Sequence, residues 1–235
     1  KFVDSDVALH RVDGAGLRAL VPRAAAALIA GIVEPNGGDI DVGALHAAAL
    51  SEFRRAGGSL MTDCRITRID RNATGWRLTA GARSIDADMV VNAGGAWTDE
   101  VAMLADVAPL GIQPLRRTIV QVRVATADVP ADLPLVMDIA GQFYFRPEGP
   151  DRLWLCPHDE TPVAAHDVAP EEIDVAHAIA RFEEATDWRV VAVERKWAGL
   201  RSFAPDRLPV FGFDAKHSNF FWCAGQGGFG IQTDR

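Results

Sequence analysis

The chain has 235 residues, of which 49% are hydrophobic and 24% are charged, and its formal net charge at pH 7 is −8. This length and apolar content suffice for one large hydrophobic core or two smaller ones, which indicates a globular protein. The acidic balance, with basic residues scattered along the chain, argues against nucleic acid or an anionic membrane as a partner.

The three cysteines, Cys64, Cys156 and Cys223, lie far apart and form no Cys-x-x-Cys pair. Their odd number and wide spacing predict neither a disulfide scaffold nor a zinc site, and the histidines lack metal-ligand spacing, so no metal is expected. A reducing, cytoplasmic setting is the default, with a place at the periphery of the inner membrane left open. No apolar run reaches the about 20 residues of a membrane-spanning helix.

The head of the chain is predicted to be irregular, with one short helix at residues 13–20. A longer helix is predicted to begin behind Asp39 or Asp41 and to end at the glycine pair that starts at Gly57. One face of this helix is apolar, through Val42, Leu45, Ala49 and Phe53.

Between residues 59 and 91 the apolar residues recur with a period close to two, which predicts a small β-meander. Its first run opens at Leu60, and its last strand, residues 89–91, is expected to be buried. Behind this strand Thr98 is a good N-cap for a helix with acidic residues in its first turn.

The middle of the chain alternates between apolar and polar residues, which predicts a largely antiparallel sheet. One helix is expected to start at Pro170, because proline is tolerated at the first helical position, and to run to about Ala185. Strands are expected at residues 115–124, 135–139, 142–146, 152–156, 190–197 and 220–223.

Two stretches join an apolar strand to glycines. Residues 88–99 read DMVVNAGGAWTD, and residues 220–233 read FFWCAGQGGFGIQT. Glycines remove side chains from the path of the chain, so that its backbone can lie against a flat or anionic ligand. Both stretches are therefore candidates for ligand binding.

Together with WAGLR at residues 197–201, these stretches make the chain resemble the FAD-dependent D-amino-acid oxidase (DAO) superfamily, most of all bacterial D-arginine dehydrogenase and related D-amino-acid dehydrogenases. The resemblance implies an α/β (α+β) fold, in which part of an FAD/NAD(P)-binding domain carries a mostly antiparallel substrate domain. The implied boundaries are 1–110 for the FAD-binding domain, 111–200 for the substrate domain and 201–235 for the return to the FAD-binding domain.

One departure from the family is evident at the head of the chain. Members begin with a strand, a Gly-x-Gly-x-x-Gly turn and a helix that holds the FAD diphosphate, whereas only Gly14 and Gly16 mimic that spacing here. Because Pro22 would stop the following helix, no dinucleotide site is expected there. We therefore expect a fragment without the N-terminal βαβ unit and the C-terminal helix, able to dimerise through exposed apolar residues at 89–91 and 220–222.

The cofactor implied by the resemblance is FAD. Its adenine is expected near Ile66, a position that the residues alone explain better as plain core. The first glycine-rich stretch contributes four cofactor-binding residues, namely Ala93, Gly94, Gly95 and Trp97. The second lines the isoalloxazine ring with Gly227, Gly228, Gly230, Ile231 and Gln232.

The substrate implied by the resemblance is a D-amino acid, whose CH–NH2 group is oxidised to an imino acid that water converts to a 2-oxo acid and ammonia. Arginine is suited to hold its carboxylate, because the planar guanidinium pairs with both oxygens. The implied substrate-binding residues are Arg117, Tyr144, Gly199, Arg201 and Gly228. No catalytic base is predicted, because direct hydride transfer from a neutral amine to flavin requires none.

Two alternatives stay open. A glycine- or sarcosine-oxidase-like amine oxidase shares the same glycine-rich skeleton, and no motif decides between a quinone or dye and O2 as the electron acceptor. From another class, the chain is a non-catalytic apo fragment that folds but binds no FAD. Absence of yellow colour in the purified protein would indicate the fragment.

Overall fold

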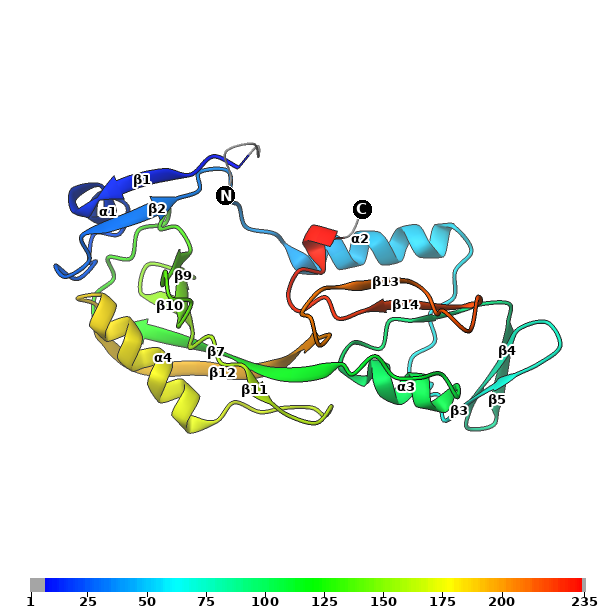
Figure 1. The fold of residues 1–235 in the computed structure, drawn as a ribbon. Coiled ribbons are helices and arrows are strands. Elements are labelled where there is room, and N and C mark those ends of the chain that lie inside the picture. Colours follow the sequence, from blue (N-terminus) through cyan, green and yellow to red (C-terminus); the bar gives the residue numbers. More distant parts are fainter. Residues whose placement is uncertain (1–6, 234–235) are drawn as a thin grey trace.

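The computed structural model describes residues 7–233 and has two groups of elements joined by two long neighbouring strands (Figure 1). One group surrounds an antiparallel sheet with a helix against it. The other contains a small mixed sheet, a three-stranded meander and two helices. This mixture of helices and mostly antiparallel strands is the predicted α+β class.

The head of the chain forms a hairpin-like unit of β1 (His10–Asp13), α1 (Gly14–Leu20) and β2 (Ala30–Val33). Asp13 caps α1 by accepting a hydrogen bond from Gly16 N at 2.8 Å. The two strands pair antiparallel. A dinucleotide-binding βαβ unit requires parallel strands, so the Gly14–Gly16 spacing is not such a site, as predicted.

Helix α2 (Val42–Arg55) begins and ends as the sequence predicts. The Asp41 carboxylate accepts a hydrogen bond from Ala44 N at 2.9 Å, and Gly57 follows the helix with φ of +88°. Its apolar face does not pack into a core among the described residues: no residue of α2 is buried, and Val42 is 57% exposed.

The predicted meander comprises β3 (Arg68–Arg71), β4 (Trp76–Ala80) and β5 (Arg83–Ala87). The prediction that a run opens at Leu60 is wrong, because that side chain is exposed and its segment is irregular. The chain then enters β6 (Val90–Asn92), which pairs parallel with β14 (Phe220–Ala224). The sequence missed β13 (Val210–Phe213), the antiparallel neighbour of β14.

The core of this group lies between the meander, α3 (Thr98–Leu104) and the small sheet. Phe220 is fully buried and packs edge-on against Trp76, and Trp222 is 3% exposed. The expectation that residues 220–222 expose an apolar surface is therefore wrong for these two aromatics. The expectation that residues 89–91 form a buried strand is right for Val90 alone, because Met89 and Val91 are 46% and 57% exposed.

The large sheet is antiparallel. Strand β12 pairs along one edge of β7, and both β11 and β10 pair along its opposite edge. Beyond β10 the sheet continues with β9 and then β8. Strand β12 is longer than predicted, because its ladder with β7 continues past residue 197 to Phe203. The strands are β7 (Gln113–Val124), β8 (Val136–Met137), β9 (Tyr144–Pro147), β10 (Arg152–Cys156), β11 (Thr161–Pro162) and β12 (Val190–Phe203).

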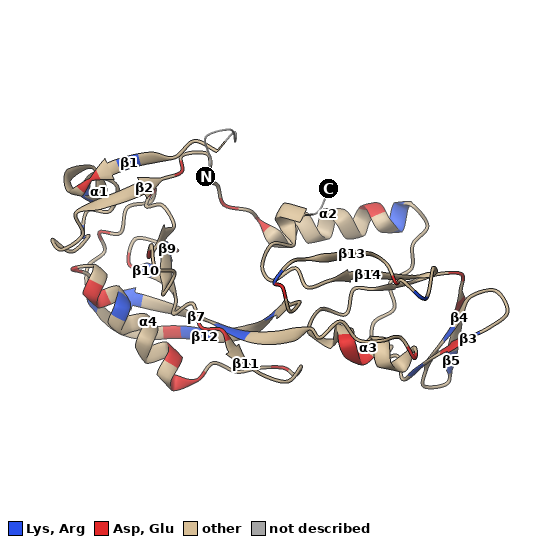
Figure 2. Cartoon of the chain, viewed as in Figure 1, with Lys and Arg blue, Asp and Glu red and all other residues tan. Residues whose placement is uncertain are grey.

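Helix α4 (Glu172–Ala185) packs on this sheet, and Phe182 on it is fully buried. The helix begins two residues later than predicted, because Pro170 precedes the N-cap, Glu171. Acidic and basic residues are interspersed along α4 and β12 (Figure 2). The core beneath α4 also contains Val21 and Ala24, so the head of the chain packs with the large sheet; the domain boundaries remain a prediction.

Asp128 ties the head of the chain to the large sheet. Its carboxylate accepts hydrogen bonds from Thr126 Oγ1 at 2.6 Å, Arg23 Nε at 2.8 Å and Trp188 Nε1 at 2.9 Å. These donors lower the pKa of Asp128 to about 2. A lowered carboxyl pKa stabilises the folded state above the unfolded value of 3.8, and the gain is lost as the pH falls through 2.

We expect Asp128→Asn to lower the free energy of unfolding at pH 7 by about 1 kcal/mol, a modest effect because solvent screens this half-exposed site. The loss should shrink between pH 4 and pH 2, which urea unfolding at several pH values measures. Asp132→Asn, an exposed position in the same loop, is the control. Equal losses at pH 7 and pH 2 would show that the charge of Asp128 has no role.

Candidate functional site

The two glycine-rich stretches meet at one edge of the small sheet. Strands β6 and β14 run parallel, with Asn92 opposite Trp222, so their carboxyl ends lie side by side. The turns that follow, residues 93–97 and 225–228, therefore share this edge. Ligands of open α/β sheets bind outside the carboxyl ends of parallel strands, which makes this edge the first candidate site.

Buried Asn92 shapes the first turn. Its Oδ1 accepts a hydrogen bond from Gly94 N at 3.2 Å, and its Nδ2 donates to Thr98 O at 2.9 Å. Thr98 is not the predicted N-cap; it is the first residue of α3, and its hydroxyl donates to Gly95 O at 2.8 Å. Ala93 and Trp97 are exposed at this turn, which leaves them accessible to a ligand.

The second turn needs its glycines. Gly225, Gly227 and Gly228 have φ of +71°, +56° and +103°, which side-chain-bearing residues rarely adopt. Gly227 N donates to Ser202 O at 2.9 Å, which fixes the loop to the end of β12. Beyond it Gly230, Ile231 and Gln232 are exposed, and the last two belong to the short 3-10 helix Ile231–Thr233.

Four predicted substrate-binding residues lie on one face of the large sheet. Gly199 of β12 is opposite Arg117 of β7, and Arg201 is two residues further along the same face. Tyr144 of β9 is opposite Cys156 of β10. Cys156 follows Leu155, the partner of Val120, and therefore shares the face of Arg117.

This face also meets the glycine-rich loop. A Cβ added at Gly228 would lie 3.0 Å from the guanidinium carbon of Arg201. The arginines of the large sheet and the turn at the edge of the small sheet therefore form one continuous site. Gly199 is exposed on it, whereas Ile66 is half-buried against the core of the other group.

Arg117 is the most unusual side chain of the site. It is 6% exposed, and its Nη2 donates to Glu160 Oε1 at 3.1 Å. Its Nε and Nη1 are buried and have no hydrogen-bond partner among the described residues. Burial, and after it the charge of Arg201, lowers the pKa of Arg117. Unpaired buried donors of a cation are costly, so this cluster is suited to an anion.

Two neutral groups complete the cluster. Burial raises the pKa of the Cys156 thiol to about 11 and raises that of the Tyr144 hydroxyl above its ordinary value. Both groups therefore keep their protons at neutral pH and can donate hydrogen bonds, but neither is suited to act as a base. Sequence patterns do not reveal Cys156 or Glu160, because their positions depend on pairing between distant strands.

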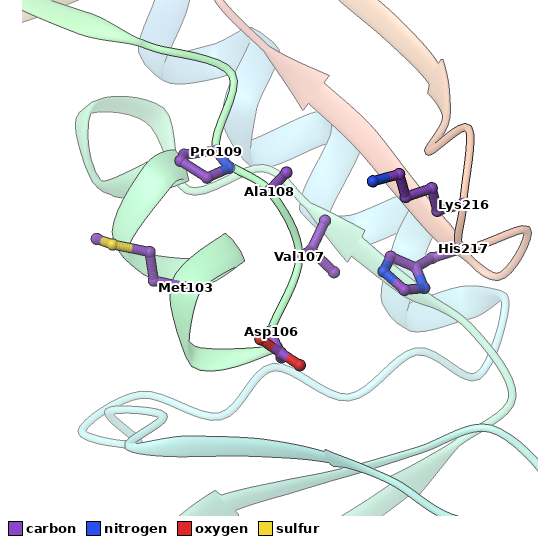
Figure 3. Close-up of a pocket in the computed structure, with 7 residues that line it drawn as sticks. All are labelled: Met103, Asp106, Val107, Ala108, Pro109, Lys216 and His217. Atoms are coloured by element: carbon purple, nitrogen blue, oxygen red, sulfur yellow. The ribbon is translucent and has the colours of Figure 1, made fainter.

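A separate pocket lies at the opposite edge of the small sheet (Figure 3). It is formed by the end of α3 with the turn after it and by the loop before β14. Asp106, Lys216 and His217 line it, but they do not form a convergent group, and it lies away from the glycine-rich turns. Within residues 7–233 no cluster of His, Cys, Asp and Glu could hold a metal, and no helix is long and apolar enough to cross a membrane.

A family model described as "FAD dependent oxidoreductase" (DAO) matches residues 3–233. The chain belongs to this family. This match confirms the predicted DAO superfamily and the predicted cofactor, FAD.

Solved structures of other enzymes share the fold of this chain. Glycine oxidase from Geobacillus kaustophilus has a TM-score of 0.82 at 23% identity, covering 98% of this chain and 60% of that chain. L-proline dehydrogenase from P. horikoshii has a TM-score of 0.81 at 18% identity, covering 96% of this chain and 61% of that chain. Mitochondrial dimethylglycine dehydrogenase from Rattus norvegicus is 25% identical over 228 residues, which are 87% of this chain and 26% of the relative.

The chain thus spans about three fifths of these solved structures and about a quarter of this curated relative. All three are named as oxidases or dehydrogenases of glycine, L-proline or dimethylglycine.

Proposed function

We propose that the full protein oxidises the C–N bond of a small amino acid whose carboxylate is bound by Arg117 and Arg201. The observation that carries this proposal is the buried Arg117 guanidinium, whose Nε and Nη1 lack a partner among the described side chains. A substrate carboxylate would satisfy these donors and offset the repulsion between the two arginines. Small neutral ligands could not do both.

The residues present fit FAD beside this anion site. Gly225, Gly227 and Gly228 have positive φ and carry no side chains that would block a flat ring. Ala93 and Trp97 are exposed on the neighbouring turn of the same sheet edge. FAD supplies the hydride acceptor when it is bound.

The protein residues then have positioning roles. Arg117 and Arg201 fix the carboxylate, which orients the adjacent carbon toward the turn at Gly228. The protonated hydroxyl of Tyr144 can donate a hydrogen bond to the same carboxylate. Burial raises the pKa of the Tyr144 hydroxyl and of the Cys156 thiol, so both keep their protons, which suits an amine that binds in its neutral form.

We propose a D-amino acid as the substrate, and glycine or sarcosine as the alternative, supported by the likeness to glycine oxidase and dimethylglycine dehydrogenase. A cytoplasmic location belongs to the same proposal, since the three cysteines are free. Whether residues 1–235 alone take up FAD is tested by the visible absorbance after adding the cofactor.

The choice of substrate is tested by turnover of the FAD-loaded full protein with D-alanine, L-alanine, glycine and sarcosine, with a dye and with O2 as acceptors. The proposal expects D-alanine to be oxidised in preference to L-alanine. Oxidation of sarcosine or glycine with no turnover of D-alanine supports the alternative. Preference for L-alanine contradicts both.

A further inference from the structure

We propose that Glu160 is a positioning residue that sets the orientation of the Arg117 guanidinium for carboxylate binding. This inference rests on the proposed function. Glu160 lies in the segment between β10 and β11, outside every motif of the sequence, and its carboxylate is the one hydrogen-bond partner of Arg117 among the described side chains.

The position of Glu160 is fixed from its own segment. The neighbouring Asp159 accepts hydrogen bonds from Thr118 N at 2.8 Å and from Thr118 Oγ1 at 2.9 Å. These contacts attach the segment to β7 one residue beyond Arg117. Glu160 is thereby placed beside the guanidinium without depending on a flexible loop.

A single contact suffices to orient Arg117. The guanidinium is planar and rigid, so a hydrogen bond at Nη2 also fixes the directions of the Nε–H and Nη1–H bonds. Glu160 Oε1 accepts from Nη2 at 3.1 Å, and the two other nitrogens stay without a partner in the described structure. The ion pair with Glu160 therefore uses only Nη2 and leaves the Nε–H and Nη1–H donors of Arg117 available to a ligand.

Arg207 neutralises the charge of Glu160. Its Nη2 donates to Glu160 Oε1 and Oε2, both at 2.9 Å. A carboxylate beside an anion site would otherwise repel the substrate, but here its charge is balanced by Arg207. Arg207 also lies 4.1 Å above the ring of Phe203, which contacts the glycine-rich loop at Gly227.

The test compares two variants that change the charge equally. Glu160→Gln keeps an oxygen acceptor for Arg117 Nη2, whereas Glu160→Leu removes it. The probe is propionate, a carboxylate without an oxidisable amine, titrated by calorimetry into the FAD-loaded full protein, with 1-propanol as the control ligand. We expect Glu160→Gln to bind propionate within about threefold of the unaltered protein and Glu160→Leu about tenfold more weakly.

Other outcomes overturn the inference in distinguishable ways. If both variants bind propionate equally, whether unchanged or more tightly, Glu160 does not orient Arg117, although the proposed function stands. If the unaltered protein does not bind propionate, the anion site itself is wrong and the proposed function fails with it. Thermal unfolding checks that Glu160→Leu folds, and Glu160→Ala replaces it if it does not.

Discussion

Replacing Arg117 by methionine is expected to lower kcat/KM for an amino-acid substrate by about 10²-fold, through a higher KM. Methionine fills a similar volume but offers no donors, so the substrate loses the buried, charge-assisted contact on which the proposed site depends. Such contacts contribute about 3 kcal/mol, which corresponds to two powers of ten. Steady-state kinetics over a range of substrate concentrations measures the effect.

The same substitution is not expected to lower the unfolding midpoint. Arg117 is buried beside Arg201 with two unpaired nitrogens, so its removal relieves an unfavourable burial. Arg123→Met is the matched control, because Arg123 lies on the same strand but pairs at the surface with Glu194. A large loss of stability in Arg117→Met, or an equal kinetic loss in Arg123→Met, would contradict a binding role for Arg117.

Gly227→Ala is expected to destabilise the protein by about 2–4 kcal/mol and to weaken FAD retention. The added Cβ would lie 2.4 Å from the ring of Phe203, and alanine rarely adopts the φ of +56°. Backbone strain and overpacking each cost about 1–3 kcal/mol. Chemical unfolding gives the stability, and the visible absorbance of the purified protein gives the bound flavin.

Gly149→Ala serves as the control for this substitution. Its Cβ would meet nothing closer than the Arg152 Cβ at 3.9 Å, an ordinary contact. We expect its stability to change by less than about 1 kcal/mol. If Gly227→Ala is as stable as this control, the loop does not require glycine at position 227 and the described turn is incorrect.

Local patterns predicted the elements that local chemistry determines. Alternation over residues 115–124 predicted β7, and Asp41 with the following apolar residues predicted the start of α2. The pattern failed where tertiary pairing decides. The strand predicted at 190–197 extends through Gly199 to Phe203, because the long ladder with β7 supplies the hydrogen bonds.

The candidate site divides in the same way. The glycine-rich turns could be predicted because glycine at positive φ is a local property. That Arg117, Tyr144 and Arg201 belong to one substrate site was implied only by the family resemblance, since they lie on strands distant in sequence. Glu160 and Cys156 carried no signal: β10 and the segment after it are brought to Arg117 by the pairing of β10 with the distant strand β7, which periodicity does not encode.

The central claim is that a carboxylate held by Arg117 brings an amine to the flavin. The most direct test is anaerobic titration of the FAD-loaded full protein with substrate pairs that differ only in the carboxylate: D-alanine against ethylamine, and sarcosine against dimethylamine. We predict that at least one amino acid bleaches the visible flavin absorbance, that its amine counterpart does not, and that Arg117→Met suppresses the bleaching at the same concentration. Equal bleaching by the amines, or an unaltered response in Arg117→Met, would contradict the claim.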